Sequence, residues 1–299
     1  MPVSSDPVLV TGATGNAGRE VVAALRARGA PARAGARNPG RVSALPPEVA
    51  RTRLDFEDPA TFDAALDGCR GVFLVRPPAI ARVKDTLNAF MDRAYALEAG
   101  PIVFLSVAGA EKNRFVPHAS VEAHLTHHGS GYTLLRPGFF AQNLQDAYLR
   151  DIRDDDRLYV PAGRGRVTFV DLRDVAEIAA RALLEPDAHD AKAYTLTGPR
   201  ADTFDDVAAV LTQTLGRSIR YEPASAPGYL GHLTRARGLS VGQALVQTVL
   251  HVGLRFGQAE TVDPTLEQLL GRPPRTIEDY VRDHAEIWRP GRRASPGDR

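Results

Sequence analysis

Gly12-Ala-Thr-Gly-Asn-Ala-Gly18 lies between an apolar run, Val8-Leu-Val-Thr11, and an amphipathic stretch, Arg19 to Arg28, that stops at Gly29. The apolar run predicts a buried parallel strand, and the amphipathic stretch predicts a helix. Glycines in such a turn permit a tight bend, a close approach of backbone to a pyrophosphate, and close packing of helix on strand. The free N–H groups of the helix would then face an anion. The stretch therefore predicts a dinucleotide-binding turn; a glycine-rich turn without a ligand is the alternative.

The composition is that of an enzyme-sized globular protein. Its 299 residues suffice for one large α/β domain or for a domain with a lobe, and a hydrophobic content of 43% suits a sizeable core. A formal net charge of +1 gives no indication of nucleic acid as a partner. The single cysteine, Cys69, excludes an internal disulfide and fits a reducing cytoplasm. No apolar stretch approaches the ~20 residues of a membrane span, and no signal peptide is recognisable, so we expect a cytoplasmic protein without a membrane partner.

Strands and helices alternate through the first half of the chain. Strands are expected at 8–11, 31–36, 51–54, 71–75, 101–106 and 132–136. Helices are expected at 16–28, 59–66, 79–98, 117–128 and 139–149. This alternation predicts an α/β fold with a Rossmann-type doubly wound parallel sheet, covered by helices on both faces and connected by right-handed crossovers.

The pattern changes after residue 157. Short strands are expected at 158–161, 167–170 and 219–222, and a further sheet strand at 193–197. Helices are expected at 171–184, 203–215, 226–236, 240–254, 264–270 and 276–288. We therefore expect a disordered N-terminus (1–6), a Rossmann core (7–157) with the late strand, a smaller, mostly helical C-terminal lobe (158–288) and a disordered tail (289–299). The lobe would lie over the carboxyl edge of the sheet, where ligands bind.

The end of the second strand indicates which nicotinamide cofactor is bound. An NAD-specific site places an acid there to accept hydrogen bonds from the ribose hydroxyls. Here the strand ends at Ala36-Arg37-Asn38 without an acid. Arg37 lies about 20 residues beyond the glycine turn, where a guanidinium can pair with a 2′-phosphate. We therefore expect NADP(H) to be preferred over NAD(H); an ordinary surface arginine is the alternative.

The ends of the other strands supply the remaining expected cofactor contacts. Asp55 and Phe56 follow the third strand, where the adenine ring would lie, although Asp55 has the alternative role of opening the next turn. The fourth strand ends facing the cofactor, and the fifth ends beside the expected nicotinamide ribose. Cofactor contacts are thus expected from Gly12, Thr14, Gly15, Asn16, Ala17, Gly18, Arg37, Asn38, Asp55, Phe56, Val75, Arg76, Pro77, Ser106, Val107, Pro137, Gly138 and Phe139.

Several motifs appear in the order found in one known family. They are Thr11-Gly-Ala-Thr-Gly-Asn-Ala-Gly18, Arg37-Asn-Pro39, Phe73-Leu-Val-Arg-Pro-Pro78, Leu135-Arg-Pro-Gly-Phe-Phe-Ala-Gln-Asn143 and Gly271-Arg-Pro-Pro-Arg-Thr276. From residue 7 to about residue 288, the chain resembles the NmrA-like family of atypical short-chain dehydrogenases/reductases. The resemblance implies an NAD(P)-binding Rossmann domain with a small C-terminal lobe. Members of that family include NADPH-dependent quinone, azo-dye and enone-type reductases, and also regulators that bind the nucleotide without turning it over.

One departure concerns acid–base catalysis. Short-chain reductases usually use Tyr-x-x-x-Lys, in which the lysine lowers the pKa of a proton-donating tyrosine. The lysines of this chain are Lys84, Lys112 and Lys192, and none has a tyrosine four positions before it. That dyad is therefore absent.

His118 is the candidate for a catalytic residue. Many members of the family carry a lysine four positions before a glutamate; Glu122 matches this glutamate, so His118 takes the lysine position and Arg114 the tyrosine position. An imidazole with an ordinary pKa near ~6.5 could donate a proton near neutral pH or hydrogen-bond a ribose hydroxyl. A half-exposed helix residue is the alternative.

The segment after the sixth strand holds the expected substrate contacts. Phe139, Phe140 and Asn143 follow Gly138 near the expected nicotinamide, and the aromatic rings could line one face of a substrate pocket. Packing of the two phenylalanines into the core is the alternative.

Three histidines are spaced as on one helix. His124, His127 and His128 could hold a metal by this spacing, but no acid or cysteine lies near them in the sequence. We therefore expect no metal site.

These observations favour an NADPH-dependent oxidoreductase that transfers hydride to a small apolar conjugated acceptor such as a quinone, an enone or an azo compound. Such an acceptor delocalises the resulting charge, so the missing tyrosine is tolerable. A non-catalytic NADP(H)-binding redox sensor and an enzyme of specialised metabolism on the same scaffold are the alternatives. The expected partner is a small-molecule substrate, and a homodimer is left open.

Overall fold

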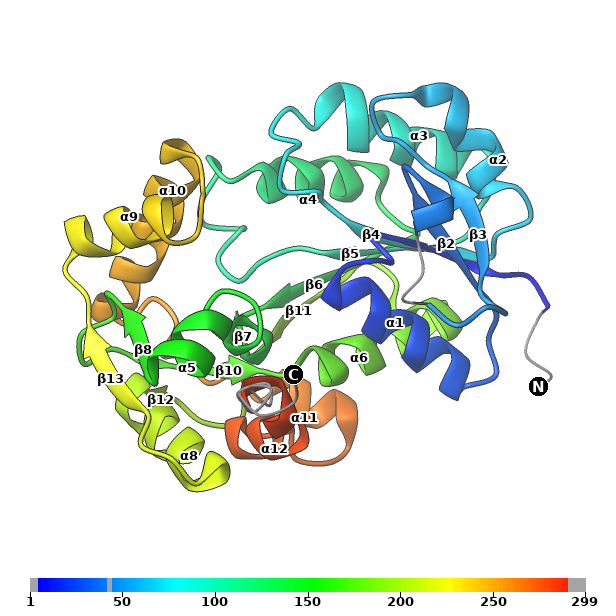
Figure 1. Cartoon of the computed structure of the whole chain (residues 1–299). Coiled ribbons are helices and arrows are strands. Elements are labelled where there is room, and N and C mark those ends of the chain that lie inside the picture. Colours follow the sequence, from blue (N-terminus) through cyan, green and yellow to red (C-terminus); the bar gives the residue numbers. More distant parts are fainter. Residues whose placement is uncertain (1–4, 42–44, 290–299) are drawn as a thin grey trace, which may run out of the picture. The chain divides into compact units, whose positions relative to one another are not determined.

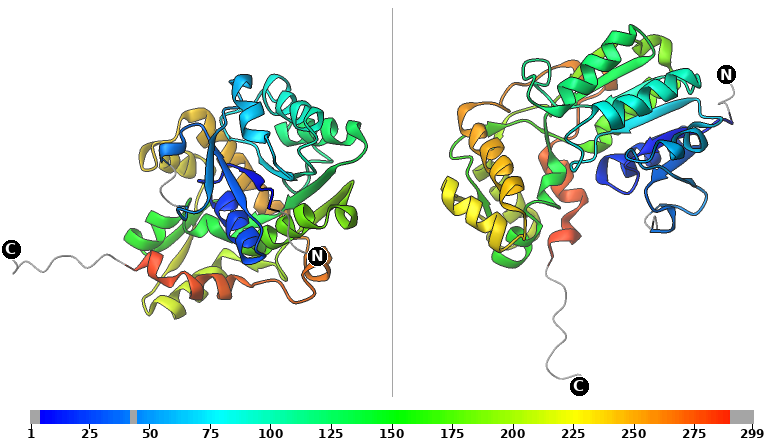
Figure 2. Two further views of the ribbon diagram at one scale, coloured as in Figure 1. Left: turned by 90° about the vertical axis from the view of Figure 1, so that its right-hand side faces the viewer. Right: turned by 90° about the horizontal axis from the view of Figure 1, so that it is seen from above.

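The computed structural model describes residues 5–41 and 45–289, which form two compact units (Figures 1 and 2). Unit 1 comprises Met1–Pro137, Leu172–Leu196 and Thr265–Arg272, and unit 2 comprises Gly138–Asp171, Thr197–Pro264 and Pro273–Arg299. The chain thus passes between the units several times. Besides the late strand expected in the core, unit 1 includes residues 172–191 and 265–272, which were expected in the C-terminal lobe. The disorder expected at both ends of the chain falls largely outside the described residues.

Unit 1 contains a seven-stranded parallel sheet with the order β11-β6-β5-β4-β1-β2-β3. Its strands are β1 (Val8–Thr11), β2 (Ala32–Ala36), β3 (Ala50–Arg53), β4 (Gly71–Val75), β5 (Ile102–Leu105), β6 (Tyr132–Pro137) and β11 (Lys192–Leu196). The strand order reverses between β1 and β4, and ligands of open α/β sheets bind at the carboxyl ends of the strands at such a switch point. The Rossmann-type fold expected from the sequence is confirmed.

Helices cover both faces of this sheet. They are α1 (Asn16–Ala27), α2 (Phe62–Leu66), α3 (Ala89–Ala96), α4 (Pro117–His128), α6 (Leu172–Leu184), α7 (Pro186–His189) and α11 (Thr265–Leu270). Figure 1 shows α1 and α6 below the sheet and α2, α3 and α4 above it, as expected for right-handed crossovers. Shorter turns of helix lie at Pro39–Arg41, Pro59–Thr61 and Lys84–Asn88.

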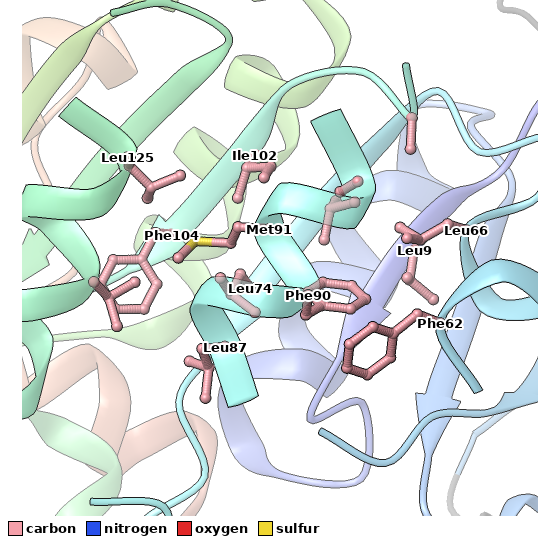
Figure 3. Packing of buried hydrophobic residues seen from close by; sticks show 14 of the residues in the cluster. Leu9, Phe62, Leu66, Leu74, Leu87, Phe90, Met91, Ile102, Phe104 and Leu125 are labelled. Carbon is pink, nitrogen blue, oxygen red and sulfur yellow. The ribbon is translucent and has the colours of Figure 1, made fainter. Parts of the chain in front are cut away.

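The core between the sheet and α2–α4 follows from the alternation of side chains along each strand. Successive residues of a strand point to opposite faces, so a strand buried on both faces is apolar throughout. Leu9, Leu74 and Phe104 point toward the α2–α4 side, where they are fully buried with Phe62 and Phe90 (Figure 3). Phe90 meets Phe62 edge to face, with ring centroids 5.2 Å apart.

The structure contradicts part of the sequence prediction for two helices. Residues 139–149 form a two-residue strand, β7 (Phe139–Phe140), and a 3-10 turn (Ala141–Leu144) instead of one helix. The apolar spacing was compatible with a helix, but β7 pairs with Phe169–Val170, and this contact with a distant segment outweighs local preference. In the helix expected at 79–98, residues 79–83 are not helical, because a turn closed by a hydrogen bond from Ile80 to Pro77 takes up residues 77–80.

Unit 2 combines three small two-stranded sheets with helices. Its strands are β7, β8 (Arg157–Val160), β9 (Arg166–Val167), β10 (Phe169–Val170), β12 (Asp202–Thr203) and β13 (Arg220–Pro223), paired as β7–β10, β8–β13 and β9–β12. Its helices are α5 (Leu149–Asp155), α8 (Phe204–Leu215), α9 (Ala226–Arg235), α10 (Val241–Gly253) and α12 (Ile277–Asp283), with 3-10 turns at Leu254–Phe256 and Ala285–Trp288. No helix in either described stretch of the chain has the length and apolarity that a membrane crossing requires.

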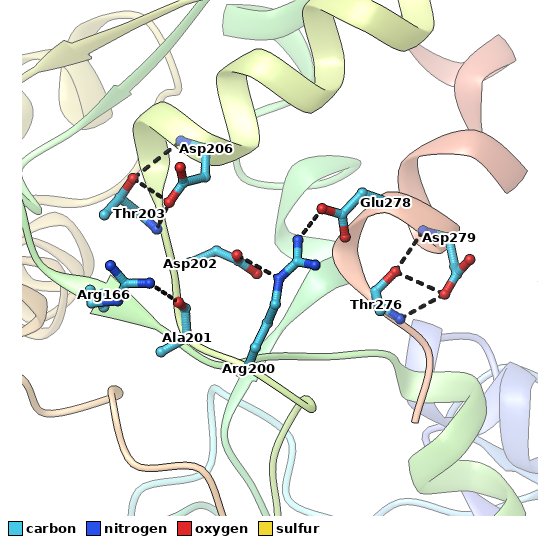
Figure 4. A network of polar contacts seen from close by, with 9 residues as sticks. All are labelled: Arg166, Arg200, Ala201, Asp202, Thr203, Asp206, Thr276, Glu278 and Asp279. Carbon is cyan, nitrogen blue, oxygen red and sulfur yellow. Dashed lines mark hydrogen bonds and ion pairs between the residues drawn. The ribbon is translucent and has the colours of Figure 1, made fainter. Parts of the chain in front are cut away.

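Polar contacts hold the helix starts of unit 2 in place (Figure 4). Thr203 and Asp206 form a reciprocal capping box at the start of α8, and Thr276 and Asp279 form another at the start of α12. Arg200 bridges these two regions by ion pairs to Asp202 and Glu278, both within unit 2.

Candidate nucleotide-binding site

The glycine turn between β1 and α1 has the backbone geometry of a phosphate cradle. Gly12 has a φ of +61°, which side-chain-bearing residues rarely adopt. A Cβ on Gly18 would lie 2.3 Å from the carbonyl oxygen of Gly12, so only glycine allows α1 to approach the turn this closely. These two positions explain the spacing of the motif without reference to a ligand.

The start of α1 is suited to an anion. Gly15 is the N-cap residue and has no side chain with which to cap the helix, and the first turn contains no acid. The backbone N–H groups of a helix start and the positive end of its dipole attract negative charge. Arg19 donates a hydrogen bond of 2.6 Å to Asn16 and adds a cation one turn into the helix. A pyrophosphate fits this set of groups.

A pocket of about 250 Å³ lies beside this turn, at the carboxyl ends of β1, β2 and β3. Its walls are Thr11, Gly12, Thr14, Gly35, Ala36, Arg37, Leu54, Asp55, Phe56, Glu57, Pro77, Ala79 and Ile80. The structure thus brings together Gly12, Thr14, Arg37, Asp55, Phe56 and Pro77, all of which the sequence had indicated. The sequence gives no indication of Ala79 and Ile80, because the spacing of residues 79–98 predicts a helix that begins there.

Arg37 lies exposed on the wall of this pocket. No carboxylate of residues 5–41 or 45–289 forms an ion pair with it, so its charge is available to a ligand. Glu57, on the same pocket, is the only acid there besides Asp55. Asn38 follows Arg37 and is exposed, but it is not part of the pocket wall.

Asp55 and Phe56 both lie on the pocket wall, and Asp55 also shapes the turn after β3. Asp55 lines the pocket, and its Oδ1 accepts a hydrogen bond of 3.1 Å from the backbone N–H of Glu57, which shapes the turn after β3. Phe56 also lines the pocket, while its ring packs edge to face on Phe90 at 5.2 Å. The part of the pocket wall that Phe56 forms is therefore held in place by packing in the hydrophobic core.

At the switch point, β1 and β4 are joined by a side chain. Thr11 is buried, and its hydroxyl accepts a hydrogen bond of 2.9 Å from the backbone N–H of Val75 at the end of β4. Val75 also lies against Gly12, since a Cβ on Gly12 would be 3.5 Å from that of Val75. The contact sets the position from which Arg76 and Pro77 leave the sheet.

Arg76 is a half-buried cation at the end of β4. Its guanidinium donates hydrogen bonds to the backbone carbonyls of Pro77 at 3.1 Å and Ile80 at 2.7 Å. No carboxylate in the described parts of the chain forms an ion pair with it, and burial lowers its pKa. A cation held by neutral carbonyls keeps a net positive charge at this edge of the sheet.

His118 lies beside Arg76, in the first turn of α4. Its Nε2 accepts a long hydrogen bond of 3.5 Å from Nε of Arg76, and its ring centroid lies 6.1 Å from that of Phe104. Burial, together with the charge of Arg76, lowers the pKa of His118 to about 4, although Glu122 opposes this shift. The imidazole is therefore neutral at neutral pH, and the ordinary pKa assumed from the sequence is wrong.

Glu122 is a structural carboxylate. It is buried, accepts a hydrogen bond of 2.5 Å from the hydroxyl of Ser106, and binds the guanidinium of Arg136 through both of its oxygens at 3.0 and 2.6 Å. Glu111 adds a longer ion pair to Arg136 at 3.5 Å. The hydroxyl of Ser106 is thus engaged within the protein, and this network ties β5 to α4 and β6.

The remaining candidate residues divide between the two units. Val107 follows Ser106, and the next residue is hydrogen-bonded to the carbonyl of Pro137 within unit 1. Gly138, Phe139, Phe140 and Asn143 belong to unit 2. There Phe139 is half-buried and packs edge to face on Phe169 at 5.5 Å, in agreement with its core role.

The reason for expecting no metal site is wrong. In the structure, Asp92 of α3 lies within hydrogen-bond distance of both His124 and His128. His127, the third histidine of this set, is exposed and is not part of the cluster. The sequence held no signal for Asp92, because it lies 32 residues before His124.

Comparisons with known proteins are consistent with this site. Residues 12–186 match a family model described as NAD(P)H-binding. The chain belongs to this family. It is 31% identical to the NAD(P)H azoreductase of Xenophilus azovorans, over 94% of this chain and 99% of the azoreductase.

Solved structures give the same result. An NADPH-dependent quinone oxidoreductase of Escherichia coli, solved with NADPH, superposes with a TM-score of 0.79 at 26% identity, covering 93% of this chain and 99% of that one. The fold is shared with the triphenylmethane reductase of Citrobacter sp. complexed with NADP(H), at a TM-score of 0.81, 23% identity and coverages of 92% and 99%. It is also shared with the transcriptional regulator NmrA, complexed with NADP, at a TM-score of 0.73, 14% identity and coverages of 95% and 97%. The resemblance to NmrA-like proteins is confirmed.

The last NmrA-like motif of the chain has a structural role. Arg272 pairs with Asp174, which is fully buried in α6, at 2.9 Å, and with Glu177 at 2.7 Å. Thr276, at the end of the same motif, caps α12. The motif therefore stabilises helices within each unit and supplies no group to the pocket.

Proposed function

We propose that the protein is an NADPH-dependent oxidoreductase that transfers hydride to a small apolar conjugated acceptor such as a quinone, an enone or an azo compound. The observation that carries this proposal is the nucleotide pocket beside an uncapped helix start, with the unpaired charge of Arg37 on its wall. The similarity to an azoreductase and a quinone oxidoreductase supports the class of acceptor.

The residues present fit a dinucleotide. The N-cap residue Gly15 has no side chain and leaves the start of α1 open to a pyrophosphate. Phe56 and Asp55 would contact the adenosine, and Arg76 and Ser106 lie at the strand ends on the nicotinamide side. When bound, NADPH supplies a hydride. The residues of the site bind and orient the cofactor and the acceptor and stabilise the charge that develops on the acceptor.

The preference for NADPH over NADH rests on Arg37. A guanidinium can bind a 2′-phosphate through two hydrogen bonds, and a free ribose hydroxyl gains no such charge-assisted contact. Asp55 and Glu57 are the acids of the pocket, and neither ends β2, where an NAD-selective acid would lie.

In place of the cofactor contact expected of Arg76 from the sequence, we assign to it the stabilisation of negative charge on the acceptor. Hydride addition to a quinone or enone leaves an oxyanion, and a fixed cation in a partly desolvated site lowers the energy of such an anion. Arg76 meets this requirement because backbone carbonyls hold it and no carboxylate of the described residues neutralises it. His118, neutral and in contact with Arg76, positions the guanidinium, and water protonates the product.

A steady-state assay tests the function. Oxidation of NADPH is followed with a quinone, an azo dye, an enone and a saturated ketone, and again with NADH. We expect turnover with the conjugated acceptors, little with the ketone, and a higher kcat/KM with NADPH. Binding of NADPH without turnover of any acceptor would replace this proposal with the redox-sensor alternative, which the absent Tyr-x-x-x-Lys dyad favours.

The role of Arg76 has its own test. Replacing Arg76 by Gln should lower kcat for the quinone by ~10-fold or more while leaving the Kd of NADPH within a factor of a few, because the charge acts on the acceptor. Arg82→Gln, in the exposed part of the same loop, is the matched control. Equal losses of kcat in the two variants would contradict the assignment.

We further propose that the protein works in the cytoplasm on a small-molecule substrate. Its one cysteine, Cys69, is buried and its pKa is raised by burial, which suits a thiol that stays reduced and unreactive.

A further inference from the structure

Two histidines of α4 and an aspartate of α3 converge on one point at the surface of unit 1. Nε2 of His124 lies 2.7 Å from Oδ1 of Asp92, and Nε2 of His128 lies 3.1 Å from the same oxygen. All three potential ligand atoms lie within 4.8 Å of one another. His124 and His128 are four residues apart on the helix, a spacing that places both imidazoles on one face.

This arrangement matches the donor set of a transition metal. Histidine pairs at positions i and i+4 of a helix bind zinc in known metalloproteins, and a carboxylate from a second element is a common third ligand. Imidazole nitrogen favours Zn²⁺, Cu²⁺ or Ni²⁺ over Mg²⁺ and Ca²⁺, which prefer oxygen. Three protein ligands leave a position for water on a tetrahedral ion.

The neighbours of the cluster support this interpretation. The adjacent cation, Arg93, is bound through two hydrogen bonds of 2.6 Å to Asp63, so it does not neutralise Asp92. The ring of Tyr95 stacks on His128 with centroids 4.2 Å apart, and it fixes the plane of that imidazole. The side chains of His124 and His128 are 24% and 30% exposed, so an ion can reach them from solvent.

We propose that Asp92, His124 and His128 form a zinc site that links α3 to α4. The site uses none of the residues assigned to the nucleotide. In the sequence, His124 and His128 lie 32 and 36 residues after Asp92. Zinc bound to the folded chain would stabilise it by mass action, because the unfolded chain does not hold the three ligands together.

The test uses the full chain without a polyhistidine tag, stripped of metal with a chelator and titrated calorimetrically with zinc chloride. We expect about one equivalent of zinc to bind and the melting temperature to rise. Asp92→Asn, His124→Ala and His128→Ala should each weaken zinc binding by ~10-fold or more, since each removes a ligand. His127→Ala is the matched control, because this residue is on the same helix, exposed and outside the cluster.

Each outcome is decisive. Loss of affinity in the three ligand variants with unchanged affinity in His127→Ala supports the site. The absence of saturable zinc binding, or an equal loss in the control, overturns it. Unchanged binding by Asp92→Asn, an isosteric replacement on an exposed residue, also overturns it, because two histidines alone would then account for the affinity. Melting of each metal-free variant verifies that it is folded.

Discussion

The adenosine side and the nicotinamide side of the proposed nucleotide site are built differently. At the ends of β1, β2 and β3, the functional groups follow directly from short continuous stretches of sequence: the glycine turn, Arg37 and Phe56. At the ends of β4 and β5, Arg76 and Ser106 also contact side chains of α4, which lie 42 and 16 residues further along the chain.

The difference shows which properties of a site a local sequence motif can determine. Backbone conformation and helix capping depend on neighbouring residues, so a glycine turn has the same geometry wherever it folds. Charge state depends on burial and on the charges brought close by the fold. His118 is the clearest case, because its pKa is lowered to about 4 by burial and by the charge of Arg76.

The largest effect is expected from Gly15→Val on the adenosine side. The valine side chain would occupy the space of the pyrophosphate and weaken NADPH binding by about 100-fold or more, equivalent to ~2.7 kcal/mol. The fold should persist, because Gly15 is exposed, has a φ of −83°, and a Cβ there would lie 3.3 Å from the oxygen of Gly12. Calorimetric titration and thermal melting measure both quantities. Undiminished binding by the folded variant would show that this turn does not contact the nucleotide.

On the nicotinamide side, Glu122→Gln should affect stability first. It removes the charge that Arg136 faces in a largely buried pair, which we expect to lower the free energy of unfolding by ~2–4 kcal/mol. Glu111→Gln removes the longer, more exposed pair to the same arginine and should cost less than ~1 kcal/mol. Urea denaturation of both variants checks this. Equal stabilities would mean that the Glu122 network does not stabilise this side of the site.

A smaller effect is expected from Arg37→Ala, on the adenosine side of the site. Loss of a charge-assisted phosphate contact should weaken NADPH binding by roughly 1–3 kcal/mol and leave NADH binding nearly unchanged. Titration of both nucleotides into the wild type and the variant provides its own control. Equal affinities of the wild type for NADPH and NADH would exclude the assignment.

The smallest effect is expected from His118→Gln. Because the native pKa is about 4 instead of 6.5, the imidazole stays neutral as pH falls from neutrality through 6.5, and the wild-type kcat should remain flat there. The unfolded chain takes up a proton on His118 in that interval and the native chain does not, so the contribution of this residue to stability decreases toward acid pH.

We expect His118→Gln to change kcat by less than ~10-fold, since it loses a positioning contact but no proton donor. His127→Gln serves as the control on the same helix. An inflection of the wild-type rate near 6.5 that disappears in His118→Gln would show that the imidazole titrates as an ordinary acid.

Most of the sheet could be predicted from the sequence because parallel strands buried on both faces are continuous apolar runs. The runs at Val8–Thr11 and Gly71–Val75 have the bounds expected of them, and α4 was expected at 117–128, where it lies. The segment after Pro137 could not be predicted, because β7 exists only through its pairing with β10, about thirty residues later.

The sequence by itself determined the parallel sheet, the glycine turn and the place of Arg37, since each depends on neighbouring residues and on the two periodicities of helix and strand. Only the tertiary structure decided which groups are charged and which share a partner. It buried Glu122 between Ser106 and Arg136, placed Arg76 against His118 at a separation of 42 residues, and set Asp92 beside two histidines. These properties depend on distance and burial, which a linear order of residues does not contain.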